Sequence, residues 1–361
     1  MMITGLRGVG KTVLLGVLED QAQAGGWVCV EAEITKNEDF GERMAWLARR
    51  ALLQVAPREK WSERVRSAAA VLKSFHITFS PAEGAFAVGF DVDADGVRAT
   101  SGRLSDDLTD LFVAIGDAAR DQNTGVAFLL DEVQFLRTEE LEALIMALHK
   151  TVQRSLPITL VGAGLPQLPR LAGEAKSYAE RLFKFPEIGR LDADEASEAL
   201  TKPARDLGVE YEADAVGVIV SYTEGYPYFL QEYGKIVWDM APDRKPISAD
   251  VAREAQPSVE QKLDGSFFRV RAERTSELEL QYLRAMAELG AGPHRTGEVA
   301  ERLNRTSDQL GPTRARLIEK GLLFTPGHGL TAFTVPQFDR YMRRNFVLNV
   351  PPIQKRRKKR V

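Results

Sequence analysis

The feature that most constrains this chain is a glycine-rich segment close to its first residue. The segment reads Gly5-Leu6-Arg7-Gly8-Val9-Gly10-Lys11-Thr12. It fits the pattern G-x-x-x-x-G-K-[ST] at every fixed position. An apolar run from Val13 to Leu18 follows and predicts a helix. A tight glycine turn that leads into a helix in this way predicts a phosphate-binding loop.

The residue types of this loop explain how it would hold a triphosphate. Glycines let the backbone curl so that its N–H groups point at phosphate oxygens, and the following helix presents the positive end of its dipole. We expect Lys11 to reach the β and γ phosphates and Thr12 to give its hydroxyl to Mg²⁺. The predicted ligands are therefore ATP and Mg²⁺, with contacts from Gly5 to Val13. A glycine turn without a nucleotide is the alternative, and it leaves the Lys-Thr pair unexplained.

A second motif supplies the acidic groups that such a loop needs. The run from Val126 to Leu130 is apolar throughout, which predicts a strand buried on both faces of a parallel sheet. Asp131 follows at its carboxyl end, where it is expected to hold Mg²⁺ through water. Glu132 comes next and is expected to polarise the attacking water. The alternative is a core strand that ends in a solvated acidic turn.

Strands and helices alternate along residues 1–190. Further strands and helices are expected at Gly26–Glu33, Asp106–Gln122, Thr138–Arg154 with Thr138 as N-cap, and Pro157–Gly164. This alternation predicts an α/β P-loop core, a parallel sheet in three layers with the ligand at the carboxyl ends of the strands. Residues 76–98 alternate with a period near two and predict a hairpin insertion.

Bulk composition excludes several classes of protein. The chain has 361 residues, 44% hydrophobic and 27% charged, so it has room for two or three ordinary globular domains. No stretch approaches the roughly 18 apolar residues of a membrane span, and the start lacks a secretory signal pattern. We therefore expect a cytoplasmic protein with no membrane partner. The single cysteine, Cys29, forms no internal disulfide and is expected to be buried in a strand.

The last third of the chain changes pattern. Helices are expected at Ser276–Leu289, Thr296–Leu303 and Ser307–Lys320, and two short strands at 322–325 and 330–335. Three helices and a hairpin predict a winged helix-turn-helix over residues 276–346. A basic tail, 347–361, follows, either as a site of non-specific phosphate attraction or as a solvated end.

The third helix of this region is the candidate for contact with double-stranded DNA, because in DNA-binding examples that helix enters the major groove. The predicted contacts are Thr313, Arg314, Arg316 and Lys320. Two alternatives stay open, since winged helices also bind proteins or pack within their own chain.

Together these motifs resemble the AAA-type ATPases close to the origin-recognition and replication-initiator group, and the signal-transduction ATPases with numerous domains. The resemblance extends from Gly5 to about Asn345 and includes bacterial ATP-binding proteins of unassigned role. It is carried by the loop and by the segments Asp131–Leu136, Val161–Pro166 and Glu224–Gln231.

The resemblance implies a helical lid domain at 191–245, joined by a linker at 246–275 to the winged helix. Tyr226 and Pro227 would line the nucleotide pocket, with packing alone as the alternative. Aromatic residues stand here where related lids present an arginine. Relatives also carry a further helix and a full first strand ahead of the loop, a segment that contributes to the adenine pocket.

Two further positions follow from the resemblance. The strand end at Gly162–Gly164 offers only backbone groups where relatives place a polar residue that senses the γ phosphate. Arg181 matches the position of an arginine finger directed at a neighbouring subunit, which implies a nucleotide-dependent homo-oligomer. The alternative for Arg181 is a surface salt bridge.

The function predicted from these features is an ATPase that acts as a nucleotide-driven switch coupled to the winged-helix module. A nucleotide-gated DNA-binding regulator with negligible hydrolysis is a second hypothesis, because a polar sensor is missing. A protein-interaction scaffold is the third.

Overall fold

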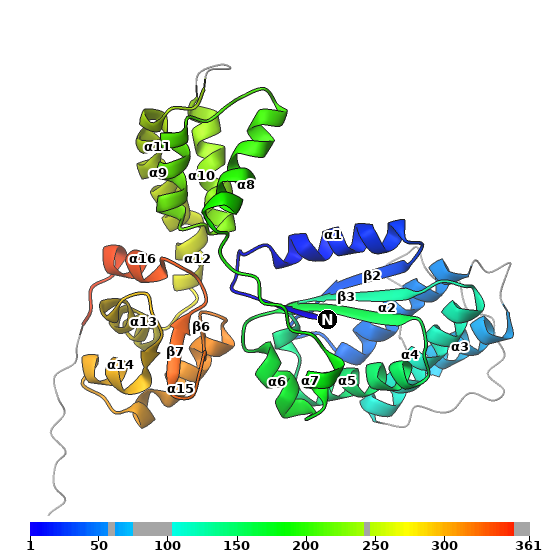
Figure 1. The fold of residues 1–361 in the computed structure, drawn as a ribbon. Helices are drawn as coiled ribbons and strands as arrows, with labels where there is room; N and C mark the ends of the chain where they lie inside the picture. The colour runs from blue at the N-terminus through cyan, green and yellow to red at the C-terminus, as the bar shows by residue number, and fades with distance from the viewer. Residues whose placement is uncertain (57–61, 75–102, 242–245, 350–361) are drawn as a thin grey trace, which may run out of the picture. The chain divides into compact units, whose positions relative to one another are not determined.

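The computed structural model describes residues 1–56, 62–74, 103–241 and 246–349, which fall into two compact units (Figure 1). The first unit contains Met1–Gly5 and Lys11–Glu187, and the second contains Leu6–Gly10 and Ile188–Val361. The hairpin predicted at 76–98 and the basic run at 355–360 lie outside the described residues.

The first unit is built on a parallel four-stranded sheet. Its strands run in the order β1-β4-β3-β2. Their bounds are β1 Met2–Thr4, β2 Val28–Glu33, β3 Val126–Asp131 and β4 Ile158–Gly164. In β3 the residues from Val126 to Leu130 are at most 3% exposed, and full burial of one such large side chain stabilises the fold by about 1.5–3 kcal/mol. The predicted doubly buried strand is confirmed.

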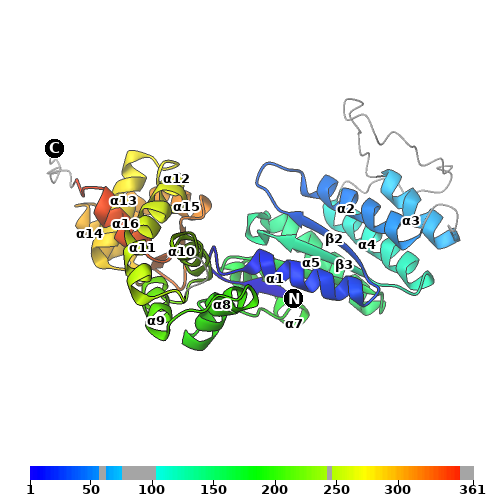
Figure 2. The same ribbon diagram turned by 90° about the horizontal axis from the view of Figure 1, so that it is seen from above.

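Helices cover both faces of this sheet. They are α1 Lys11–Ala24, α2 Phe40–Val55, α3 Glu63–Ser74, α4 Leu104–Asp121, α5 Thr138–Gln153, α6 Leu168–Ala175 and α7 Ala179–Leu182. Helix α1 lies against β2, β3 and β4 on one face, whereas α4 and α5 pack on the other (Figures 1 and 2). The predicted three-layer α/β arrangement is confirmed.

Helix α5 begins at Thr138, but Thr138 is not its N-cap. The N-cap is Arg137, whose backbone N–H donates to Glu140 Oε2 at 2.8 Å. Glu140 is only 5% exposed and also accepts a 2.8 Å bond from Arg137 Nε. The prediction is therefore wrong by one residue, because a carboxylate one turn into the helix reaches back to the residue before Thr138.

The second unit begins with a bundle of four helices that lie side by side in Figure 1. They are α8 Ala193–Asp206, α9 Ala213–Thr223, α10 Pro227–Met240 and α11 Ala249–Lys262. A π-helical turn, Leu263–Phe268, continues α11 into α12, Arg269–Ala272. The interval 246–275 was expected as a linker, yet it is largely helical, and α11 packs on α9 and α10.

The remaining elements appear in the order that the sequence predicts. They are α13 Glu277–Leu289, β5 His294–Arg295, α14 Thr296–Arg302, α15 Ser307–Glu319, β6 Leu323–Phe324, β7 Leu330–Phe333 and α16 Phe338–Asn345. The three strands form an antiparallel sheet in the order β5-β7-β6. Strand β5 and helix α16 were not predicted. Within the described ranges, no helix is long and apolar enough to cross a membrane.

A buried carboxylate joins α13 to α15. Glu279 is 1% exposed, and it accepts bonds from Arg316 Nε at 3.0 Å and Lys320 Nζ at 2.6 Å. Burial acts to raise the pKa of Glu279, but the hydrogen bonds from Lys320, from the Ser276 N–H and from Arg316 outweigh it and lower the pKa to about 2. The ion pairs therefore stabilise the folded chain as long as Glu279 is ionised.

The free energy of unfolding should therefore decrease as the pH falls from 4.5 toward about 2. A carboxyl group with a lowered folded pKa stabilises fully above its ordinary value of 4.5, and this stability is lost as the pH falls toward about 2. We expect the wild type to lose on the order of 1–2 kcal/mol more unfolding free energy across this window than Glu279→Gln, since solvent screens the half-exposed cations. Urea unfolding at a series of pH values measures this difference. Glu277→Gln, an exposed change on the same helix, should behave as wild type, and parallel curves for all three proteins would contradict the assignment.

Candidate nucleotide-binding site

The loop between β1 and α1 depends on two glycines. Gly8 has φ +82° and Gly10 has φ +95°, a left-handed region that costs little for glycine alone. A Cβ added at Gly8 would also lie 3.2 Å from the Tyr226 hydroxyl oxygen and 3.1 Å from Tyr228 Cβ. Backbone N–H of Tyr228 donates to Gly8 O at 3.2 Å. The glycine pattern is thus explained by backbone conformation at both positions and by close packing at Gly8.

The lysine of the motif is held inside the loop. Lys11 is 7% exposed, and its Nζ donates to Gly5 O at 3.0 Å. Gly5 in turn donates its N–H to Gly164 O at 3.1 Å, which continues the β1–β4 pairing. The ammonium group is therefore fixed at the carboxyl end of the sheet, where a phosphate-binding cation is needed.

The predicted metal ligands meet directly. Thr12 Oγ1 donates to Asp131 Oδ2 at 2.5 Å, although 119 positions separate the two residues. A hydroxyl oxygen beside a carboxylate oxygen is the hard donor set that Mg²⁺ prefers, and Mg²⁺ keeps its other positions for water and phosphate. The two side chains therefore fit the predicted metal.

Thr12 and Asp131 help to line a cleft of about 380 Å³ in the first unit. Its other walls come from β2 and α2, with Glu31 and Glu33 on the strand and Trp46 on the helix. Arg43 and Arg50 both lie over the Trp46 ring, with guanidinium-to-centroid distances of 5.2 and 4.9 Å. Charges of both signs border the cleft.

Glu132 adopts an unusual backbone conformation directly after the strand. Its φ and ψ are 54° and 34°, a left-handed conformation that costs a residue with a side chain on the order of 1–2 kcal/mol. Its N–H donates to Asp131 Oδ1 at 2.7 Å. Both oxygens of Asp131 are therefore engaged, one by Thr12 and one by Glu132, so the carboxylate has a fixed orientation.

Gln134 is the site residue that sequence reasoning missed. It is 9% exposed, its Nε2 donates to Glu132 Oε2, and its Oε1 accepts from Leu165 N at 3.0 Å. Gly164 leaves room for this amide, because an added Cβ would come within 2.7 Å of Gln134 Oε1. Gln134 thus links the Glu132 carboxylate to the end of β4, where the sequence offered only backbone groups. The one available signal was a glutamine two residues after the acidic pair.

The other predicted nucleotide-contacting residues of the loop and of the start of α1 differ in how exposed they are. Leu6 and Arg7 are half-buried, and Val9 is 7% exposed in the core of the second unit. Val13 is 67% exposed on α1, so any nucleotide contact of this residue would come from its backbone. Nucleotide contacts by these residues stay a prediction.

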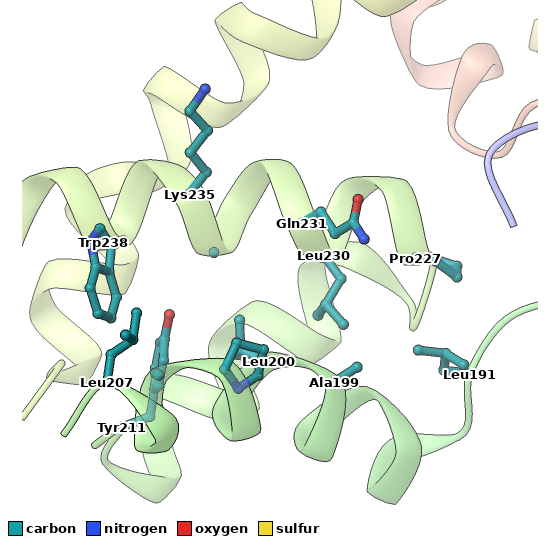
Figure 3. Close-up of a pocket in the computed structure, with 13 residues that line it drawn as sticks. Leu191, Ala199, Leu200, Leu207, Tyr211, Pro227, Leu230, Gln231, Lys235 and Trp238 are labelled. Atoms are coloured by element: carbon teal, nitrogen blue, oxygen red, sulfur yellow. The ribbon is translucent and has the colours of Figure 1, made fainter. Parts of the chain in front are cut away.

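The two predicted lid residues lie at the start of α10. Tyr226 is fully buried as the N-cap residue, and Pro227 follows as the first helical residue. Pro227 also borders an apolar groove of about 400 Å³ between α8 and α10, whose labelled side chains include Leu200 and Trp238 (Figure 3). A role of Tyr226 and Pro227 toward a nucleotide stays a prediction, as does the finger role of Arg181, which is exposed on the short helix α7.

The residues predicted to contact DNA are largely engaged inside the second unit. Thr313 is 1% exposed. Arg314 donates to Thr331 Oγ1 at 2.6 Å, Thr325 Oγ1 at 2.7 Å and Leu330 O at 3.0 Å. Arg316 and Lys320 share Glu279, as described above. As placed, Thr313 offers DNA almost no surface, and DNA contact by the four residues stays a prediction.

The fold and the site define the class of this protein. A parallel sheet carries a glycine-lysine-threonine loop after its first strand and an Asp-Glu pair at the carboxyl end of β3, the arrangement of a P-loop nucleotide-binding protein. Residues 1–161 match the AAA ATPase domain family, and residues 265–342 match a domain of unknown function. The N-terminal part of the chain is therefore similar to AAA ATPase domains.

One of three similar solved structures supports the fold. A Walker-type ATPase of Pyrococcus abyssi is 15% identical, over 95% of this chain and 90% of that chain, with a TM-score of 0.59. The RuvB Holliday junction branch migration motor of Thermotoga maritima is 18% identical, over 92% and 83%, with a TM-score of 0.45. The Aeropyrum pernix ORC1 protein in complex with DNA is 14% identical, over 95% and 86%, with a TM-score of 0.40. The last two likenesses are too weak to bear on the fold. No curated protein matches the chain.

The buried amide of Gln134 generates a stability prediction. Gln134→Leu keeps the side-chain size but leaves the Leu165 N–H and the Glu132 carboxylate without this partner. Loss of buried partners costs about 1–3 kcal/mol, so the unfolding free energy should fall by that amount in chemical denaturation. Gln153→Leu, at an exposed position of α5, serves as the control and should stay within about 0.5 kcal/mol of wild type. Equal stability of the two variants would show that the amide is not held as described.

Proposed function

We propose that this chain is an ATP-driven molecular switch, in which Mg²⁺-dependent ATP hydrolysis in the AAA domain controls the winged-helix region. The observation that carries the proposal is the 2.5 Å contact between Thr12 Oγ1 and Asp131 Oδ2 beside the buried Lys11. Lys11 would bind the β and γ phosphates, and Thr12 and Asp131 would hold the metal. Mg²⁺, when bound, neutralises charge on the phosphate oxygens.

Glu132 is proposed to activate the attacking water. A carboxylate has about four acceptor positions on its two oxygens. Gln134 engages Oε2, and no donor among the described residues contacts Oε1, so Oε1 can accept a hydrogen bond from water. A general base needs this reach toward the water whose proton it takes. Gln134 then sets the orientation of the group that performs this step.

Two substitutions separate binding from turnover. Lys11→Ala removes the cation that holds the phosphates, so ATP binding should weaken at least about 100-fold, near 3 kcal/mol. Glu132→Gln keeps the size and the Gln134 contact but removes the base, so ATP binding should persist while phosphate release falls by about 10²–10⁴-fold. Isothermal calorimetry and a phosphate-release assay measure the two quantities.

Lys150→Ala, at an exposed position near the end of α5, is the matched control and should bind and hydrolyse ATP as the wild type does. Equal ATP affinity in wild type and Lys11→Ala would overturn the proposed site. Steady turnover in Glu132→Gln would leave the site in place and remove Glu132 from the mechanism.

For the winged-helix region, docking of a protein partner is a second candidate role. It is supported by the hydrogen bonds and ion pairs that its basic side chains form within the second unit. Thr313 is buried, Arg314 is bound to the hairpin, and Arg316 and Lys320 are paired with Glu279. The helix that would enter a DNA groove also exposes Asp308 near its start. The four predicted contact residues of α15 therefore offer little free positive charge to a phosphate backbone.

This arrangement predicts weak binding to duplex DNA. A mobility-shift titration at 50 and 200 mM salt is the test, because a protein that neutralises several phosphates loses affinity steeply over this interval, about 10³-fold or more for six contacts. We expect no salt-sensitive complex at micromolar protein. Tight binding that falls steeply with salt would instead favour the DNA-binding role, and Glu279→Gln is the informative variant because it releases Arg316 and Lys320.

A further inference from the structure

Two arginines of the second unit lack a carboxylate partner, unlike their neighbours. Arg190 and Arg340 share Glu224, and Arg344 pairs with Glu260 and Asp264. Arg7, by contrast, forms no hydrogen bond or ion pair with any described residue, and Arg271 has no carboxylate partner among them. Both side chains belong to residues that are only partly exposed. These two cations are therefore not neutralised within the described part of the chain.

Three buried polar atoms in this region also have no hydrogen-bond partner. They are Arg7 Nε, Arg271 Nε and the Tyr226 hydroxyl. Tyr226 is fully buried. Burial raises the pKa of the Tyr226 hydroxyl, and the positive charges of Arg271, Arg190 and Arg7 oppose that rise. The hydroxyl is thus a neutral donor that lies within the electrostatic reach of the same two arginines.

The guanidinium groups are oriented by neighbouring groups. Arg271 Nη1 donates to Phe267 O, and the Arg271 guanidinium lies 3.9 Å from the centroid of the Phe267 ring. Arg7 lies against Gly321, where an added Cβ would be 2.6 Å from Arg7 Nη2. Gly321 also has φ +67°, so it provides both a helix end and the space for Arg7.

Such an arrangement is costly unless an anion is present. Burying an unpaired charge is unfavourable, and removing the partner of a buried charge typically costs several kcal/mol. Burial, and then the positive charge of Arg7, lower the pKa of the Arg271 guanidinium, as expected for two like charges that lie close together. Arginine stays protonated even so. A group of negative charge would relieve this repulsion.

Two positive charges together with three donor groups favour a phosphate over a carboxylate. Each guanidinium presents a planar fork of N–H donors that matches phosphate oxygens, and the Tyr226 hydroxyl adds a third donor. Two positive charges suit an anion that carries about two negative charges. Arg7 also lies within the Gly5–Thr12 loop, whose pattern is that of a phosphate binder.

We propose that Arg7, Arg271 and Tyr226 form a binding site for a phosphate group. The phosphate comes either from a nucleotide or from free phosphate, and the nucleotide source rests on the function proposed above. Arg271 is the informative residue because it lies outside the loop motif.

The first test measures the thermal unfolding of the full chain with and without sodium pyrophosphate, and with and without ATP and Mg²⁺, at matched ionic strength. Arg271→Met removes an uncompensated cation and keeps an apolar stem on Phe267. Its melting temperature without anion should therefore equal or exceed that of wild type, while the anion affinity, from titration, falls about tenfold or more. Arg269→Met, an exposed arginine paired with Glu273, is the matched control and should respond as wild type does.

Tyr226→Phe provides an independent variant. The hydroxyl has no partner within the described residues, so its removal should leave the fold intact and weaken the anion response. If Arg271→Met does not fold, Tyr226→Phe decides the question alone. If the folded variants are stabilised by the anion as much as wild type is, the proposal is overturned. A lower melting temperature of Arg271→Met without anion does not change this conclusion, because it would show only that Arg271 stabilises the fold.

The second test separates the two sources of phosphate. Stabilisation by pyrophosphate that persists in Lys11→Ala and is lost in Arg271→Met identifies a free phosphate. Stabilisation by ATP alone, lost in both Lys11→Ala and Arg271→Met, identifies a phosphate of the bound nucleotide. Wild-type ATP affinity in Lys11→Ala overturns the proposed function but not this site. Wild-type responses to both ligands in Arg271→Met overturn this site and leave the proposed function standing.

Discussion

The parallel pairing of β1, β4 and β3 is the constraint on which the nucleotide site depends. Thr4 lies opposite Gly164, and Leu130 lies opposite Gly162. Because the strands are parallel, the loop that follows β1 and the acid that ends β3 open at the same edge of the sheet. The Thr12–Asp131 contact is possible only in this register. A slip of one residue in β3 would turn Asp131 to the opposite face.

The part of the site that could be predicted from the sequence is the part where residue type and position are both fixed by chemistry. Lys11, Thr12 and Asp131 belong to patterns that phosphate and Mg²⁺ impose, and the structure brings Thr12 and Asp131 together. Gln134 could not be assigned in this way. Its partner Leu165 N lies 31 positions away, and no periodicity connects a glutamine side chain with a distant backbone N–H. Such a contact becomes visible only when the positions of β3 and β4 are known.

The same limit applies to the second unit. The helical period of α15 could be recognised in the sequence. Which of its side chains are engaged depends on distant partners, because Glu279 from α13 binds Arg316 and the hairpin binds Arg314. The DNA-contacting residues were therefore predicted from residue type and from the place of the third helix, without knowledge of these partners. Strand β5 has only two residues, too few for alternation to show. Helix α16 did carry a signal, since Phe338, Tyr341 and Met342 are spaced for one buried face.

The π-helical turn Leu263–Phe268 has a consequence for the whole second unit. From Ala249 to Ala272 the chain stays helical, but a π turn holds one residue more than an α-helical turn. Since an α-helix advances about 100° per residue, the extra residue shifts the angular phase of α12 relative to α11 by about that amount. Phe267 and Phe268 both enter the core, and Arg271 is carried with them. The length of this turn, more than the identity of its residues, thus sets the direction in which the Arg271 guanidinium projects.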